Sequence, residues 1–143
     1  MALNVAQKLI RSHLLGGETR PGAEIALKVE QILLQDVLGI LVMLELEAMG
    51  VERSKAEVAV QYVDHNLVQG DHLNAEEHLF LRSACRRFGV WYSRPGNGIS
   101  HPVHMARFGV PGHWSMPSRT WSPSSSPGQP WGLTRAPVGV SAH

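Results

Sequence analysis

Residues 57–63 read EVAVQYV, and Asp64, His65 and Asn66 follow them directly. The run predicts a buried strand, the clearest one in the chain. An aspartate beside a histidine at the end of such a strand can orient and charge the imidazole, which then acts as a general acid. The dipeptide alone favours a simpler alternative, a turn in which Asp64 caps the backbone that follows.

The segments around this strand predict alternating helices and strands. Working outward, we expect helices over residues 3–15, 36–49 and 74–88, and further strands over 24–29 and 90–93. Asp36 is expected to cap the second helix, which Gly50 ends. Asn74, with Glu77 three residues on, begins the third helix, and Gly89 ends it. Strands joined by helices at this spacing predict an α/β fold with three layers, α/β/α, around a mainly parallel sheet.

Active groups in parallel sheets gather at the carboxyl ends of the strands. Two polar stretches fall there, the Asp-His-Asn triplet and GNGISH at residues 96–101. The loop 96–98 permits positive φ angles and a close approach of backbone to a ligand, which makes His101 a candidate catalytic residue. His104 lies three residues further on. Two histidines without a third ligand are weak evidence for a metal, so we predict no metal site in this chain.

Gln35 and Asp36 open the second expected helix. Backbone amides and the helix dipole at such a position favour an anion, such as a substrate carboxylate. Simple N-capping explains the same two residues equally well. Cys85 lies among apolar residues of the third expected helix and is predicted to be a small core residue. A chain with one cysteine forms no internal disulfide and no metal site that needs several thiolates.

The composition is that of a globular protein without a particular partner. Hydrophobic residues make up 43% and charged residues 17% of the 143, and the net charge is +1,. All acidic residues lie between Glu18 and Glu77, but the arginines beyond them are scattered, so a nucleic-acid partner is not expected. The N-terminus has no long apolar run and no cleavage site. We therefore expect no signal peptide and no membrane span, and a cytoplasmic location.

The character of the sequence changes after Gly112. Residues 113–143 show no periodicity, contain no acidic residue, are dense in serine and proline, and hold most of the tryptophans. A flexible linker or a Pro-rich ligand would explain part of this composition. A change of reading frame in GC-rich coding sequence fits better, because linkers are usually poor in tryptophan. We expect an α/β domain over residues 1–112 and an irregular tail, disordered or frameshifted, over 113–143.

Four separated stretches carry a resemblance to a known family. They are PGAEIALKVEQILLQD at 21–36, LELEAMGV at 44–51, YVDHNLVQ at 62–69 and NAEEHLFLRSACRRFGVWYSRPGNGISHPVHMARFGVPG at 74–112. In this order and spacing they resemble the N-terminal region of the aconitase and isopropylmalate dehydratase family of iron-sulfur hydro-lyases. Residues 93–112 resemble bacterial aconitases more than isopropylmalate dehydratases.

The resemblance implies the interconversion of citrate and isocitrate through cis-aconitate, a reaction of the tricarboxylic acid cycle. In the family a 4Fe-4S cluster is the Lewis acid that binds the substrate hydroxyl and a carboxylate. Gln35 matches the family's substrate-contacting glutamine. Asp64 and His65 match its proton-donating pair, and His101 matches a second catalytic histidine.

The sequence also departs from the family pattern. Val37, Leu38 and Ile40 stand where the family usually has small and hydroxylated residues. After Gly112 a glycine-rich Asp-Ser-His motif is missing, and with it the aspartate that pairs with His101. The three cluster-binding cysteines and a serine base are missing as well. The resemblance therefore implies a truncated hydro-lyase that holds no cluster and is inactive as an isolated chain.

Two alternatives stay open at this point. One is a fragment of the large subunit of an isopropylmalate or homoaconitate dehydratase. The other is a non-catalytic interaction protein that uses a Pro-rich, basic tail. In an intact relative later strands would complete the parallel sheet, so here we expect an unpaired edge, self-association, and low solubility or a molten state.

Overall fold

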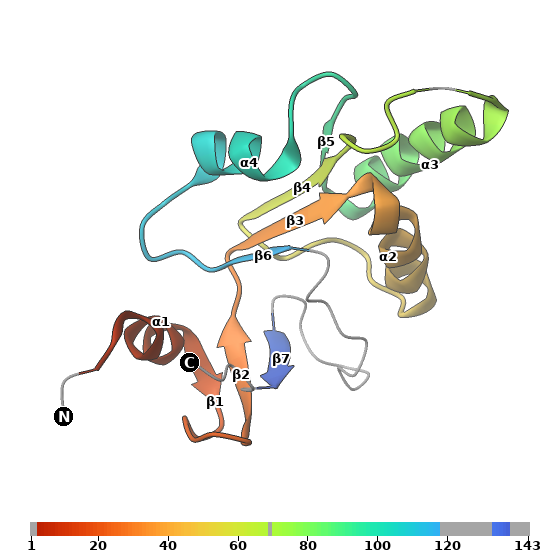
Figure 1. Cartoon of the computed structure of the whole chain (residues 1–143). Helices are drawn as coiled ribbons and strands as arrows, with labels where there is room; N and C mark the ends of the chain where they lie inside the picture. The colour runs from red at the N-terminus through yellow and green to blue at the C-terminus, as the bar shows by residue number, and fades with distance from the viewer. Residues whose placement is uncertain (1–2, 69, 118–132, 138–143) are drawn as a thin grey trace.

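The larger sheet is built from four parallel strands. The computed structural model describes residues 3–68, 70–117 and 133–137. Strands β3 (Gln31–Gln35), β4 (Val58–Tyr62), β5 (Trp91–Ser93) and β6 (Ser115–Pro117) lie in the order β5-β4-β3-β6 (Figure 1). Every neighbouring pair is parallel. The predicted α/β class and mainly parallel sheet are confirmed.

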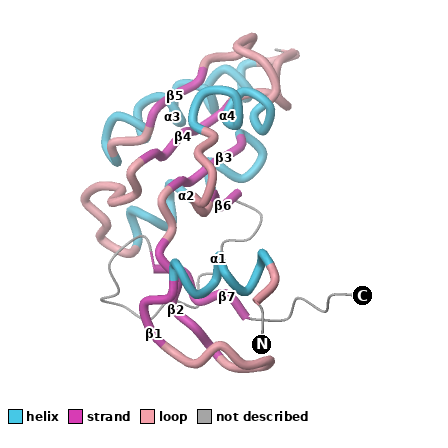
Figure 2. The backbone as a smooth tube through the Cα atoms, turned by 90° about the vertical axis from the view of Figure 1, so that its left-hand side faces the viewer, coloured by secondary structure: helices cyan, strands magenta, loops and turns pink. Residues whose placement is uncertain are grey.

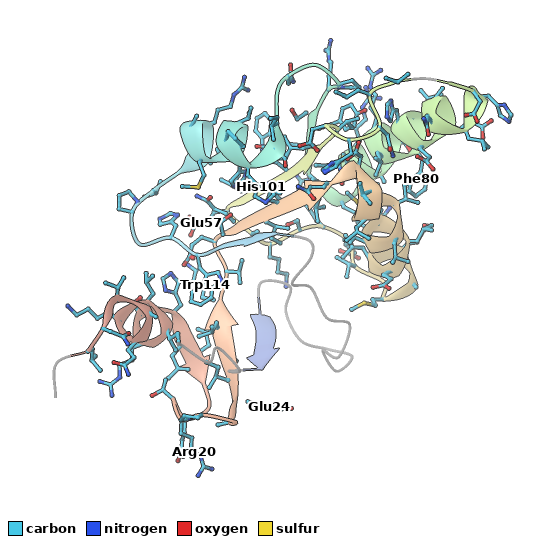
Figure 3. All side chains as sticks on the ribbon, in the orientation of Figure 1. Arg20, Glu24, Glu57, Phe80, His101 and Trp114 are labelled. Atoms are coloured by element: carbon cyan, nitrogen blue, oxygen red, sulfur yellow. The ribbon has the colours of Figure 1, made fainter. Side chains whose placement is uncertain are left out.

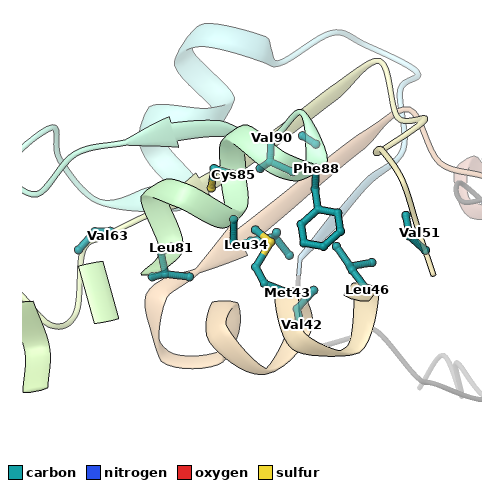
Figure 4. Close-up of a cluster of buried hydrophobic side chains, with 12 residues drawn as sticks. Leu34, Val42, Met43, Leu46, Val51, Val63, Leu81, Cys85, Phe88 and Val90 are labelled. Atoms are coloured by element: carbon teal, nitrogen blue, oxygen red, sulfur yellow. The ribbon is translucent and has the colours of Figure 1, made fainter. Parts of the chain in front are cut away.

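Helices cover both faces of this sheet, which gives the expected three layers. Helices α2 (Asp36–Ala48) and α3 (His72–Phe88) pack together on one face, and α4 (Ser100–Phe108) lies on the other (Figure 1). Because successive side chains of a strand point to opposite faces, neighbours Leu33 and Leu34 belong to different clusters,. The larger cluster contains Leu34, Val42, Met43, Leu46, Val51, Ala59, Val63, Leu81, Ala84, Cys85, Phe88 and Val90 (Figure 4).

A second, smaller sheet is antiparallel and lies apart from the three layers (Figure 2). It contains β1 (Leu14–Gly16), β2 (Glu24–Lys28) and β7 (Leu133–Pro137), in that order, and α1 (Val5–His13) contacts β2. The prediction that places 24–29 in the parallel sheet is therefore wrong. The strand that takes that place is β3, which carries the continuous apolar run Ile32–Leu34. Such a run is typical of a strand buried on both faces. It lacks the alternation of polar and apolar residues from which strands 24–29 and 57–63 are predicted.

The segment 113–143 contributes two of these strands. Within it the structure describes residues 113–117, which include β6, and residues 133–137, which form β7. The expectation of an irregular tail over residues 118–132 and 138–143 lies outside the described residues.

The N-cap of helix α3 lies three residues earlier than capping chemistry predicts. The helix begins at His72, because the Asp71 carboxylate accepts a hydrogen bond from the backbone N–H of Leu73 at 3.0 Å,. The side chain of Asn74, the predicted cap, donates to the carbonyl of Val68 instead. The predicted end is confirmed, since Gly89 adopts the left-handed conformation with φ +68°,.

Helix α2 is apolar on more than one side. Its periodicity predicts a core face that includes Leu41 and Leu44, yet these are 56% and 47% exposed, whereas Met43 is fully buried. When apolar residues lie all round a helix, their spacing does not indicate which side faces the core. Within the described ranges, no helix is both long enough and apolar enough to cross a membrane.

Glu30, between β2 and β3, joins the two sheets. It is buried, and its Oε2 accepts a hydrogen bond from the backbone N–H of Trp114 at 3.0 Å and lies 3.2 Å from Nε2 of His13. Burial by itself would raise the pKa of Glu30, but the Trp114 N–H, the nearby His13 and Lys28 outweigh it and lower that pKa,. One buried carboxylate thus ties α1 and β6 to the connection between the sheets.

His104 fastens α4 to the larger sheet. Its ring is 1% exposed, with Nδ1 3.1 Å from the Tyr62 hydroxyl and Nε2 3.1 Å from Oε1 of Gln31. The Gln31 amide donates to the carbonyl of Phe108, which leaves its Oε1 to accept a proton from Nε2. Burial, and secondarily the charge of His101, lower the pKa of His104,. The ring is therefore neutral, with Nδ1 accepting from Tyr62.

Acid is expected to weaken the docking of α4. The pKa of His104 is ordinary, about 6.5, in the unfolded chain and lower in the folded one, so between these values the unfolded state binds more protons,. The stability contributed by neutral His104 is present above about pH 6.5 and is lost as the pH falls through the folded value. A nuclear magnetic resonance titration should give a midpoint for the His104 ring below about 6.5. A midpoint at or above that value would contradict the buried, neutral ring.

Candidate active site

Polar side chains from three connections meet at one edge of the larger sheet. They follow the carboxyl ends of β3, β4 and β5, as predicted for active groups of a parallel sheet,. All four sequence-predicted residues lie there, and two further residues join them. The candidate site consists of Gln35, Asp36, Asp64, His65, Ser100 and His101.

Asp36 is the buried centre of this site. It is 3% exposed, and its Oδ2 accepts hydrogen bonds from the backbone N–H groups of His65 (3.0 Å) and Asn66 (2.7 Å). Its Oδ1 lies 3.0 Å from Nδ1 of His65. Asp36 is the first residue of α2, so the N-cap is Gln35, whose side chain makes no capping bond. The prediction that Asp36 caps this helix is wrong, because its carboxylate is used across the loop after β4.

Asp64 links the end of β4 to the start of α4. Its side chain is 6% exposed, and Oδ2 accepts a hydrogen bond from the backbone N–H of Ser100 at 2.7 Å. Its Oδ1 lies 2.7 Å from Nδ1 of His65, but the ring N–H points at Asp36, so this close contact is not a directed hydrogen bond. The alternative in which Asp64 caps the backbone that follows it is therefore wrong, because Asp36 accepts the hydrogen bonds of those N–H groups.

His65 stands at the surface above these two carboxylates. Its side chain is 44% exposed, whereas those of its two acidic partners are 1% and 6% exposed. With two carboxylate oxygens within 3.0 Å of Nδ1, that nitrogen carries a proton,. The other ring nitrogen, Nε2, makes no hydrogen bond and no ion pair among the described residues. His65 can therefore exchange a proton with a ligand through Nε2 while its Nδ1 stays fixed.

Gln35, Ser100 and His101 form a second polar chain beside the first. The Gln35 amide donates to Oγ of Ser100 at 2.9 Å, and this hydroxyl lies 3.2 Å from Nδ1 of His101. Ser100 is fully buried, while His101 is exposed at the start of α4 (Figure 3). A hydroxyl proton donated to Nδ1 leaves Nε2 of His101 as an N–H donor for a ligand.

The loop before α4 adopts the conformation expected of its glycines. Gly96 and Gly98 have φ angles of +88° and +108°, whereas Asn97 does not adopt a positive φ. A side chain at Gly98 would also approach Val103 within 2.9 Å. These glycines let the chain turn from β5 into α4 so that Ser100 and His101 reach the sheet edge.

Two other candidates from the sequence lie away from this edge. His104 is buried, and both of its ring nitrogens have protein partners, so it forms no pair with His101. Cys85 belongs to the main core, as predicted, and burial raises its pKa to about 12.

A cation could in principle be held by Asp36, Asp64 and His65, whose ligand atoms lie within 4.8 Å of one another. The same side chains already contact each other and accept hydrogen bonds from four backbone N–H groups. A metal would have to displace the proton on Nδ1 of His65. The arrangement is therefore better described as a histidine supported by two buried carboxylates.

Asp36 and Ser100 are the site residues that sequence reasoning missed. Asp36 was assigned to helix capping because it directly precedes an apolar helix, and Ser100 has a common residue type in a polar loop. The one available signal was their position beside Gln35 and His101 at predicted strand ends.

Comparison with known proteins gives a distant relationship. No family model matches the chain. The mitochondrial aconitate hydratase of Arthroderma benhamiae is 25% identical over 152 residues, which cover 96% of this chain and 19% of that protein. The mitochondrial homocitrate dehydratase of Saccharomyces cerevisiae is 23% identical over 158 residues, with the same coverage of 96% and 19%.

These matches cover almost all of this chain but little of the relatives. The chain spans about a fifth of the length of the curated relatives it matches. Since residues 1–112 are only 112 of the 143, a match over 96% of the chain includes residues beyond Gly112. The chain therefore has a distant, fragment-like similarity to hydro-lyases of the aconitase family.

Proposed function

We propose that this chain carries the proton-donating part of an aconitase-type hydro-lyase site, which acts on a hydroxy tricarboxylate such as citrate. The observation that carries this proposal is the meeting of Gln35, His101 and the Asp64–His65 pair at one sheet edge. The distant similarity to aconitate hydratases supports the same reaction class. The homocitrate dehydratase match supports hydroxy tricarboxylates more generally.

His65 is the proton donor in this proposal. Elimination of water requires a proton for the departing hydroxyl, and a positioned imidazolium supplies it. Asp36 and Asp64 hold the ring by Nδ1, so that Nε2 is left to carry the proton that the departing hydroxyl receives,.

Gln35 and His101 orient the anionic substrate. The exposed Nε2–H of His101 can donate to a substrate carboxylate, and Gln35 holds the ring of His101 through Ser100. Charge-assisted hydrogen bonds of this kind contribute about 1.5–3 kcal/mol each. Val37, at the start of α2, is 59% exposed beside them and would present an apolar wall to this part of the substrate.

The iron-sulfur cluster of the family does not fit the residues of this chain. A 4Fe-4S cluster needs thiolate ligands, and the only cysteine, Cys85, is a buried thiol whose pKa is raised to about 12,. In aconitase-type enzymes the cluster supplies the Lewis acid that activates the hydroxyl. We therefore propose that the chain alone binds the substrate but does not dehydrate it.

Loss of Asp36 should loosen the site. Asp36→Ala leaves the backbone N–H groups of His65 and Asn66 without an acceptor, at a cost of about 1–3 kcal/mol for each,. The matched control is Asp71→Ala, which removes one exposed cap and should cost about 1 kcal/mol,. Urea unfolding measures both free energies. Equal losses in the two variants would show that Asp36 does not support the site.

Citrate should bind to the chain at this edge. We expect it to shift the nuclear magnetic resonance signals of the His65 and His101 rings and to leave that of buried His104 unchanged. His101→Ala should weaken binding roughly tenfold, as expected for a lost charged hydrogen bond. The control His72→Ala, an exposed position on α3, should leave it unchanged.

Turnover provides the complementary test. Formation of cis-aconitate, followed by its ultraviolet absorbance, should be absent even when iron and sulfide are supplied. Citrate binding that leaves the ring signals of His65 and His101 unchanged would refute the proposed site. Turnover would refute only the conclusion that this chain holds no cluster.

A further inference from the structure

Four arginines that are scattered in the sequence gather around one surface groove. The groove has a volume of ≈ 470 Å³ and lies where the end of α3 meets β5, and Arg53 and Arg94 are among its lining residues. Arg82 and Arg86, one turn apart on α3, complete the set. The groove shares no residue with the candidate active site.

The charges of this groove are not balanced within it. Its remaining lining residues are Cys85, Gly89, Val90, Trp91 and Tyr92, none of them acidic. All four arginines are exposed, and no ion pair to them occurs among the described residues. In contrast, Arg87, the next residue along α3, donates to the carbonyl of Glu52 and lies over the Phe88 ring. On α3, Arg87 therefore has partners within the protein, whereas Arg82 and Arg86 are exposed and without an ion pair among the described residues.

An aromatic surface completes the groove. Trp91 is 70% exposed although it lies in a strand, and Tyr92 follows it in the lining. An exposed indole next to guanidinium groups suits a ligand that has both a flat ring and negative charge, because the ring stacks while the guanidinium forks bind anionic oxygens in pairs.

We infer that this groove binds a nucleotide, through arginine contacts to phosphate and stacking of the base on Trp91. The volume falls within the range of roughly 300–1,000 Å³ typical of small-ligand sites. A tricarboxylate would satisfy the arginines but would leave the indole without a partner. The nucleotide can be free or part of a single strand, since both present the same phosphate and base.

Binding to the full 143-residue chain can be measured with two probes, a fluorescent ATP derivative and a fluorescein-labelled oligothymidylate. At least one probe should bind with an affinity that falls steeply with salt, as phosphate contacts require. Preference for the first identifies a free nucleotide, and preference for the second a single strand. Binding of neither would overturn the inference.

Variants separate the two kinds of contact. Trp91→Leu should weaken binding roughly tenfold, and Trp91→Phe should restore most of it, because a ring is retained. Arg82→Gln with Arg86→Gln should weaken binding and reduce its salt dependence, whereas the control Arg11→Gln with Arg107→Gln removes equal charge outside the groove and should have little effect,.

Competition tests the need for a base. Inorganic tripolyphosphate and polyglutamate carry charge without a base, so both should compete at least tenfold more weakly than ATP. Equal competition by either one, or equal loss of binding in the control variant, would overturn the inference in favour of general attraction of anions.

Discussion

The carboxylate of Asp36 is the contact on which the candidate site depends. It lies at the junction of β3 and α2, is almost fully buried, and accepts hydrogen bonds from two consecutive backbone N–H groups after β4. A buried charge is costly unless it is well paired, so Asp36 fixes the loop after β4 in one conformation. Asp64 fixes the start of α4 in the same way, because its carboxylate accepts a hydrogen bond from the backbone N–H of Ser100. Two carboxylates therefore hold three connections in register, and the positions of His65 and His101 follow from them.

This arrangement also explains why the two histidines face solvent. The carboxylates and Ser100 occupy the interior side of the edge, so the imidazoles can only point outward. Each ring is held through Nδ1, His65 by carboxylates and His101 by a hydroxyl, so neither of these contacts uses Nε2. The two rings differ in their partners, because Nδ1 of His65 meets two carboxylates whereas Nδ1 of His101 meets a hydroxyl.

The sequence predicts the type of most helices and strands and the location of the site. It does not predict which strands pair with each other or which distant groups a side chain contacts. Strand β4 and helix α3 follow from local pattern, and the strand-end rule brings Asp64, His65 and His101 to one edge. The local pattern of residues 24–29 predicts a strand but not its sheet, because β2 pairs with β1 and with β7, and β7 lies more than a hundred residues further along the chain. Asp36 was misassigned for the same reason, since its hydrogen bonds reach residues about thirty positions away. The arginine groove was invisible in sequence because Arg53 and Arg94 meet Arg82 only in the fold.

Under the proposed function, this chain would contain one part of hydro-lyase chemistry without the other. Proton donation and substrate orientation need only side chains fixed at a sheet edge, and the hydrogen bonds that fix them all lie within residues 35–101. Activation of the leaving hydroxyl needs a Lewis acid, and the single buried thiol cannot supply its ligands,. The first part is formed without the second because none of its contacts runs through a metal ligand. Under the proposed function such a site would bind and orient an anion through side chains alone, and its geometry is set by Asp36 and Asp64 together with Gln35 and Ser100.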